Sequence, residues 1–161
     1  MDYLWTPWRY RYISSIDREQ KECVFCIGDS PDRDAERLVL YRGKFNFIIL
    51  NLFPYTSGHV MISPYRHFSD LSDCTAEQAT EMFRLTQAVK QAVTLTYHPD
   101  GFNIGMNLGR CAGAGVENHL HLHVVPRWIG DANFMTVVGE SRVLPDDMQT
   151  TYQKLKVHFQ S

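Results

Sequence analysis

Three histidines occupy every second position of the segment Asn118-His119-Leu120-His121-Leu122-His123-Val124-Val125-Pro126. Successive side chains of a β-strand point to opposite faces, so an extended conformation would place His119, His121 and His123 on one face. The aliphatic residues between them would bury the other face. Imidazoles arranged in this way could be a solvated polar surface, could bind zinc with ligands from elsewhere, or could attack phosphorus as nucleophiles.

A glycine-rich turn before this segment favours phosphate chemistry. Gly113-Ala114-Gly115 lets the backbone approach a ligand closely, and successive exposed N–H groups form a cradle for anions. Hairpin loops also use glycine, so the turn indicates a phosphate site only in combination with the histidines. An imidazole that attacks phosphorus forms a phosphoramidate and divides one difficult displacement into two easier ones.

The cysteines suggest a metal half-site. Cys23 and Cys26 form a Cys-x-x-Cys pair, and two thiolates need two further ligands to close a tetrahedral zinc site. The alternative interpretation is a reduced pair on an N-terminal loop. Cys74 and Cys111 are interpreted as ordinary small apolar residues.

Composition limits the class of protein. The chain has 161 residues, of which 44% are hydrophobic and 21% charged, which predicts one globular domain over residues 1–161. Residues 1–30 are expected to form an N-terminal arm that carries the cysteine pair. A net charge of −2 gives no basic surplus for nucleic acid, and no apolar run approaches the ~20 residues of a membrane helix. Without a signal-peptide core at the N-terminus, we expect a cytoplasmic location and reduced cysteines.

Hydrophobic periodicity and turn residues predict an α+β fold with an antiparallel five-stranded sheet. A capping box at Thr75 and Gln78 begins the clearest helix, at residues 75–97. A second, C-terminal helix is expected at 145–158, and residues 28–37 are expected to be an exposed polar loop. The five strands are expected at residues 38–41, 45–50, 58–63, 102–107 and 119–125.

The alternation of histidine with aliphatic residues, followed by Pro126, resembles the signature of the histidine triad (HIT) superfamily of nucleotide hydrolases and transferases. The resemblance implies a HIT-like fold and a homodimer in which the sheets of two subunits join. Other segments resemble the branch that includes bacterial diadenosine tetraphosphate phosphorylases. They are residues 5–9, 101–107, 113–115, 126–128 and 130–134, whereas residues 45–67 resemble the first half of the family in general.

The resemblance assigns roles to single residues. His121 matches the nucleophile that forms the nucleotidyl-enzyme, and His123 matches the histidine that binds and polarises the phosphate. Asn51 matches the residue that bonds the ribose hydroxyls, and Asn107 an amide near the scissile phosphate.

The phosphate loop departs from the commonest hydrolase pattern. Gly113 and Gly115 match the loop, but hydrolases usually place Gln or Ser side chains where this chain has Ala114 and Gly115. Fewer side chains are then available to position a leaving group. The departure fits the phosphorylase branch better than simple hydrolysis.

The resemblance also suggests how the metal site closes. Uridylyltransferase relatives complete such a site with a histidine after a Ser-Pro turn and with the first triad histidine. In this chain those residues are His67 and His119, which join Cys23 and Cys26 in a structural zinc site. No organic cofactor is implied.

The remaining histidines receive simpler interpretations. His59 is expected to be a packing or hydrogen-bonded residue, His98 to lie at a helix end, and His158 to be solvated.

The resulting hypothesis is a nucleotidyl transferase or hydrolase acting on dinucleoside polyphosphates through a covalent nucleotidyl-histidine. One alternative is a nucleoside phosphoramidate hydrolase or a hexose-1-phosphate nucleotidyltransferase-like enzyme. A second is a zinc-stabilised, nucleotide-binding regulatory module without significant turnover. The sequence leaves open whether phosphate or water is the acceptor.

Overall fold

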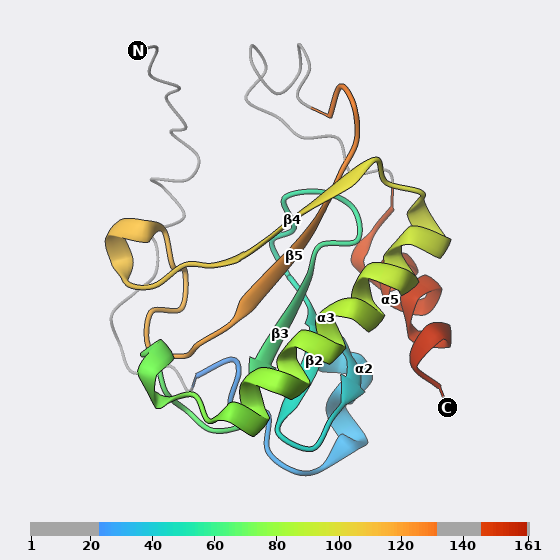
Figure 1. The fold of residues 1–161 in the computed structure, drawn as a ribbon. Coiled ribbons are helices and arrows are strands. Elements are labelled where there is room, and N and C mark those ends of the chain that lie inside the picture. Colours follow the sequence, from blue (N-terminus) through green and yellow to red (C-terminus); the bar gives the residue numbers. More distant parts are fainter. Residues whose placement is uncertain (1–22, 132–145, 161) are drawn as a thin grey trace, which may run out of the picture.

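The computed structural model of the chain describes residues 23–131 and 146–160 (Figure 1). Predicted features that involve residues 1–22 and 132–145 lie outside this part. The described helices and strands are α2 (Asp34–Arg37), β1 (Val39–Arg42), β2 (Asn46–Leu50), β3 (Val60–Pro64), α3 (Ala76–Tyr97), β4 (Gly101–Met106), β5 (Leu122–Arg127) and α5 (Met148–Lys156). Short 3-10 helices cover Pro31–Arg33, Leu71–Asp73, Arg110–Ala112 and Val157–Phe159.

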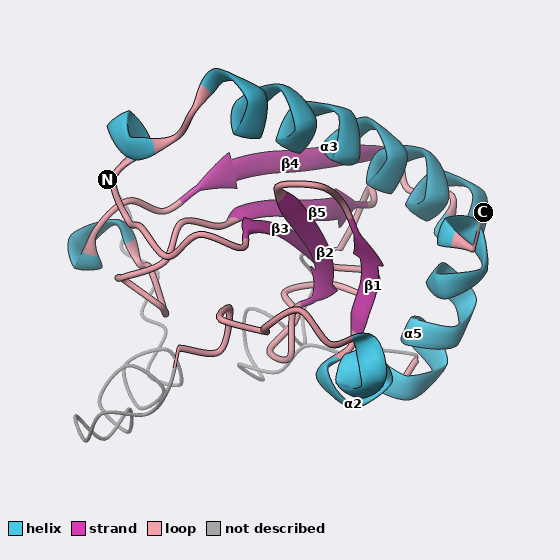
Figure 2. Ribbon diagram, turned by 90° about the horizontal axis from the view of Figure 1, so that it is seen from below, coloured by secondary structure: helices cyan, strands magenta, loops and turns pink. Residues whose placement is uncertain are grey.

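The strands form one antiparallel five-stranded sheet in the order β1-β2-β3-β5-β4. The long helix α3 runs across one face, and α5 lies at the β1 side of the same layer (Figure 2). The predicted α+β class, with one long and one C-terminal helix, is confirmed.

Alternation along the strands divides the core between the two faces of the sheet. The face under the helices carries Leu40, Ile48, Leu50, Val60, Ile62 and Val124, packed against α3 and α5. The other face carries a cluster of Phe25, Ile27, Val39, Phe47, Ile49 and Met61, which we call the Phe25 cluster. The chain before β1 therefore supplies two residues, Phe25 and Ile27, to the core on this face of the sheet.

The start of α3 follows the prediction. Thr75 Oγ1 accepts a hydrogen bond from the N–H of Gln78, and the Gln78 side chain accepts from the N–H of Thr75. The helix ends at Tyr97, and His98, with a left-handed backbone (φ 47°), caps it. The expected position of His98 at a helix end is confirmed.

The two edges of the sheet differ. At the β1 edge, Lys156 Nζ of α5 donates to the carbonyl of Leu40 (2.9 Å), and Tyr152 Oη donates to the carbonyl of Val39 (3.3 Å). At the opposite edge β4 is exposed in its middle, and Ile104 keeps 46% of its surface accessible. A helix covers one edge, and the other edge is open in the described part of the chain.

The histidine segment departs from the prediction at its start. β5 begins at Leu122, so His119 and His121 precede the strand, and the predicted strand 119–125 is wrong at that end. Pro64 ends β3 and has no N–H to donate across the sheet. Ser63 Oγ donates to the carbonyl of Leu120 in its place (2.9 Å).

Two helical predictions also need correction. The C-terminal helix begins at Met148, because the Asp147 side chain caps it by accepting from the N–H of Thr150 (2.7 Å). Residues 28–37 are not only an exposed loop, because they contain a 3-10 turn and α2. Ser30 caps that turn and Pro31 occupies its first position, a helix-start signal in the sequence that the prediction missed.

None of the helices in residues 23–131 and 146–160 combines the length and apolar character that crossing a membrane requires.

Candidate active site and metal centre

The three histidines keep a continuous row although the strand is shorter than predicted. Phe25 contacts the rings of His119 (centroids 5.5 Å apart) and His121 (4.8 Å), and His121 contacts His123 edge-on (4.9 Å). His123 pairs with Met61 in the β3–β5 register. Residues opposite each other in a sheet share a face, so the row lies on the side of the Phe25 cluster.

A backbone carbonyl fixes the tautomer of His121. Its Nδ1 lies 2.8 Å from the carbonyl oxygen of His119. A carbonyl only accepts, so Nδ1 carries the proton, and Nε2 of the neutral ring has a lone pair. His121 is 4% exposed, and this desolvation lowers its pKa, an effect that the bond to the carbonyl opposes. A neutral imidazole with an unprotonated Nε2 is a competent nucleophile.

A second chain of hydrogen bonds orients His123. The N–H of Tyr55 donates to Nδ1 of His59 (3.1 Å), so neutral His59 carries its proton on Nε2. That nitrogen lies 2.9 Å from Nδ1 of His123 and donates to it. His123 therefore has its own proton on Nε2. Desolvation, with a smaller effect of His121, lowers the pKa of His123 to about 4.

His59 is a functional candidate that the sequence interpretation did not include in the site. It was expected to be a packing or hydrogen-bonded residue, and the structure shows it buried and bonded to His123. A Gly-His pair at the start of a strand carries no signal of a partner 64 residues away.

Asn51 joins this chain of hydrogen bonds. Its Oδ1 accepts from the N–H of Phe53 (3.0 Å), which orients the amide so that Nδ2 faces Nδ1 of His59 (3.3 Å). The structure therefore brings Asn51 to the histidine row through His59.

Asn107 and the glycine turn lie in the segment that joins β4 to the histidine row. Asn107 follows β4, whose last residue Met106 pairs with Leu122 of β5. Gly113 takes a left-handed conformation (φ 87°) and donates its N–H to the carbonyl of Arg110. Val116, just after Gly115, packs against the Phe25 cluster. The turn thus returns to the sheet face that carries the histidines.

The four predicted metal ligands come together. One ligand atom from each of Cys23, Cys26, His67 and His119 lies within 4.8 Å of the others. Nδ1 of His119 is 3.3 Å from Cys23 Sγ, 3.8 Å from Cys26 Sγ and 3.2 Å from Nδ1 of His67. Nδ1 of His67 is 3.3 Å from Cys26 Sγ.

Four of the six distances between these atoms, 3.2–3.8 Å, are close to those around a tetrahedral zinc ion. Bonds of about 2.3 Å to sulfur and about 2.0 Å to nitrogen place tetrahedral ligands about 3.3–3.8 Å apart. Desolvation, together with the hydrogen bond and charge of Cys23, raises the pKa of the Cys26 thiol. A cation between the two sulfurs would relieve that repulsion, because metal ligands bind as thiolates.

A carbonyl also sets the tautomer of His119. Its Nε2 lies 2.8 Å from the carbonyl oxygen of Pro64 and must donate to it, which leaves Nδ1 facing the two sulfurs. His119 is 1% exposed, and this desolvation lowers its pKa. The ring is therefore neutral with its lone pair toward the cluster, as a metal ligand requires.

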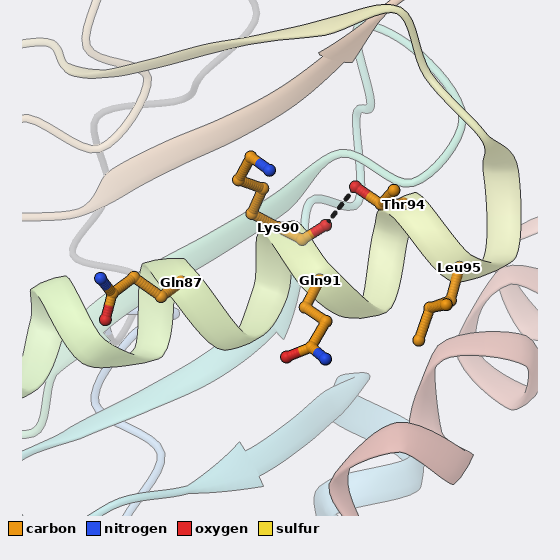
Figure 3. A pocket seen from close by; sticks show the side chains of 5 residues that line it. All are labelled: Gln87, Lys90, Gln91, Thr94 and Leu95. Atoms are coloured by element: carbon orange, nitrogen blue, oxygen red, sulfur yellow. Dashed lines mark hydrogen bonds between the residues drawn. The ribbon is translucent and has the colours of Figure 1, made fainter.

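Features away from the row offer less chemistry. Cys111 is exposed and Cys74 partly exposed, and neither belongs to the cluster of candidate metal ligands. His158 is exposed as expected but bonds to Thr96 Oγ1 (3.0 Å). A hollow over the outer face of α3, drawn in Figure 3, is lined by Gln87, Lys90, Gln91, Thr94 and Leu95. All five belong to one helix on the opposite side of the sheet from the histidines.

The fold and this arrangement of histidines define a HIT-domain protein. The HIT domain family matches residues 32–128. The chain therefore belongs to the HIT domain family, and the predicted membership is confirmed.

The chain is similar to curated relatives and to solved structures. The AP-4-A phosphorylase of Mycobacterium tuberculosis is 40% identical over 162 residues, which cover 97% of this chain and 83% of the relative. The bis(5'-adenosyl)-triphosphatase of Saccharomyces cerevisiae is 34% identical over 91 residues, or 56% of this chain and 44% of that protein. The crystal structure of a Zn-bound histidine triad family protein from Mycobacterium smegmatis has a TM-score of 0.66 and 33% identity, and covers 85% of this chain and 92% of that one.

Proposed function

We propose that the chain is a nucleotidyl transferase or hydrolase that cleaves dinucleoside polyphosphates through a covalent nucleotidyl-His121. The observation that carries the proposal is the opposite protonation of two neighbouring rings. His121 has a lone pair on Nε2, and His123 has a proton on its own Nε2. The resemblance to an AP-4-A phosphorylase over 97% of the chain supports this substrate class.

In the first step Nε2 of His121 attacks the α-phosphorus of the substrate. A nitrogen–phosphorus bond forms, and the bond to the bridging oxygen breaks. The remaining nucleoside polyphosphate leaves with the electron pair. The Nε2 proton of His123 bonds the phosphate oxygens that gain charge, while the His119 carbonyl stabilises the cationic ring of the adduct.

In the second step an acceptor oxygen attacks the same phosphorus, and the electron pair of the broken nitrogen–phosphorus bond returns to His121. Water gives a nucleoside monophosphate, and inorganic phosphate gives a nucleoside diphosphate. We favour phosphate, because Ala114 and Gly115 provide no polar side chain at the turn to position the leaving group.

The surrounding residues bind and orient the nucleotide in this proposal. Asn51 bonds the ribose hydroxyls, and Asn107 bonds the scissile phosphate. The backbone of Gly113, Ala114 and Gly115 receives the phosphate chain. Binding that aligns the α-phosphorus with Nε2 of His121 supplies much of the rate enhancement.

Cys23, Cys26, His67 and His119 hold a structural zinc ion in this proposal. Zinc would join the segment before β1 to the chain between β3 and β5, and it takes no part in bond exchange. The ligand distances support zinc, as does the Zn-bound family structure from M. smegmatis.

We also place the protein in the cytoplasm as a homodimer joined through β4. The exposed Ile104 and the open edge of β4 support this interface. Sedimentation of the wild-type chain and of Ile104→Lys tests it, because a charge at a paired edge should shift the mass from two chains to one. An unchanged dimer would place the interface elsewhere.

Incubation with diadenosine tetraphosphate tests the reaction. With inorganic phosphate we expect ATP and ADP, and without phosphate ATP with slow release of AMP. Mass spectrometry of the quenched protein should find one added AMP on the peptide that contains His121. Wild-type protein that turns over without ever gaining this mass would contradict the covalent mechanism.

A further inference from the structure

Phe25 lies between the two cysteines of the metal centre and against the proposed nucleophile. Its ring is 3% exposed and stacks on the ring of His121, with centroids 4.8 Å apart and planes 29° apart. The same ring contacts His119 at 5.5 Å. Residues from the metal centre and the transfer site therefore share one aromatic neighbour.

The backbone around Phe25 is a tight turn with a cysteine at each end. The N–H of Cys26 donates to the carbonyl of Cys23, and the N–H of Ile27 donates to the carbonyl of Phe25, both at 3.0 Å. The sulfurs at both ends face Nδ1 of His119. Ligation of both sulfurs would thus fix the ends of the turn and the direction in which Phe25 points.

The ring of His121 needs a second restraint besides its hydrogen bond. The bond from Nδ1 to the His119 carbonyl holds one edge of the ring, but a single bond leaves the ring free to tilt about it. The stacked face of Phe25 opposes this tilt on one side, and the ring of His123, at 74° to His121, packs edge-on against it. The direction of the Nε2 lone pair depends on this packing.

We infer that Phe25 is a positioning residue that couples the Cys23–Cys26 turn to the ring of His121, so that nucleotidyl transfer depends on an ordered metal centre. The inference rests on the proposed function and gives the metal centre a role in the rate as well as in the fold. Phe25 acts through His121 and exchanges no bond with the substrate.

Nuclear magnetic resonance of the zinc-loaded full chain, with labelled histidine, gives a readout that does not depend on activity. Removal of zinc with a chelator should shift the ring resonances of His121 in the wild type. In Phe25→Leu the starting shift should change, because the stacked ring is gone, and the response to the chelator should fall to less than half. An equal response in both proteins would overturn the inference.

Kinetics provide the second readout. Phe25→Leu should lower kcat for diadenosine tetraphosphate by about tenfold or more, with a smaller change in KM, since a tilted nucleophile misses the phosphorus. The matched control is Phe47→Leu. Phe47 is a buried member of the same cluster, and its ring contact is with Tyr65 at 5.3 Å. An equal fall of kcat in both variants would reduce Phe25 to a core residue.

The two proposals fail in different ways. If the wild type never gains AMP on His121 while its resonances respond to zinc through Phe25, the covalent mechanism is wrong and the coupling stands. If the adduct forms and zinc removal leaves the His121 ring unchanged, the coupling is wrong and the mechanism stands.

Discussion

His119 and His121 are two residues apart and contact the same phenylalanine, yet they present opposite ring nitrogens. His119 donates from Nε2 to the carbonyl of Pro64 and leaves Nδ1 for the thiols. His121 donates from Nδ1 to the carbonyl of His119 and leaves Nε2 for the substrate side. The difference teaches that backbone carbonyls can divide one row of identical side chains into a proposed metal ligand and a proposed nucleophile.

The largest expected effect comes from removing the nucleophile. His121→Ala should lower the rate of diadenosine tetraphosphate cleavage by at least about 10³-fold while keeping nucleotide binding. His158→Ala is the matched control, because this exposed histidine lies on the C-terminal 3-10 helix. A cleavage rate in His121→Ala equal to that of the control would remove His121 from the mechanism.

Removing a ligand of the proposed metal centre should strongly lower the stability of the fold. Cys26→Ser should lose zinc, and the free energy of unfolding should fall by about 4 kcal/mol when free zinc is about 1,000 times its dissociation constant. Metal analysis and denaturant titration measure both effects. The exposed Cys111 provides the control, and Cys111→Ser should keep zinc and stability. Full zinc occupancy in Cys26→Ser would refute the assignment.

The neutral state of the row predicts how stability depends on pH. The pKa of His123 is lowered from 6.5 to about 4, so the unfolded chain binds more protons between these values. The free energy of unfolding should therefore fall by up to about 3 kcal/mol as the pH decreases from 6.5 to 4, and this contribution should level off below 4. Urea titrations of the wild type and His123→Gln should differ in this slope. Equal slopes would show that His123 is not kept neutral by the fold.

Loss of the hydrogen bond between His59 and His123 should lower kcat less than removal of His121 does. His59→Gln removes the donor that fixes the tautomer of His123, and kcat should fall about 10- to 100-fold. The comparison is with His98→Gln, a helix-end residue outside the row. If the two variants keep the same kcat, the orientation of His123 does not depend on His59.

The smallest effect on the protein is expected from removing the side-chain hydrogen bond between Ser63 and the backbone of Leu120. Ser63→Ala removes the donor to the Leu120 carbonyl and should lower the free energy of unfolding by about 1–3 kcal/mol. Thermal unfolding measures this loss, with Ser72→Ala on the exposed 3-10 turn as the control. No difference in stability would mean that another donor satisfies this carbonyl.

Local pattern was sufficient for most of the fold. Short apolar runs bounded by turn residues located most of the strands, and the capping box at Thr75 located the start of α3. The sequence did not predict that His119 and His121 lie outside β5. Strand pairing at these positions depends on Pro64, which lies in another strand. Sequence spacing does not say which backbone donors a neighbouring strand will lack.

Part of the candidate site could likewise be predicted from the sequence, and part required the structure. A short histidine pattern and a family resemblance were enough to name the four candidate metal ligands that the structure brings together. The contacts of Phe25 and His59 were not predicted, because each joins elements that are distant in sequence and neither residue carries a local signature. Both tautomers also required coordinates, since they depend on the carbonyls of His119 and Pro64.

Lys156 covers one edge of the sheet and so limits how copies of this protein could assemble. A sheet with two accessible edges can add a copy at each edge and grow into a filament. A sheet with one accessible edge can pair with only one further copy. Because α5 already occupies the β1 edge, the proposed association through β4 would stop at a closed pair. A residue far from the histidines would thereby protect the protein from runaway polymerisation.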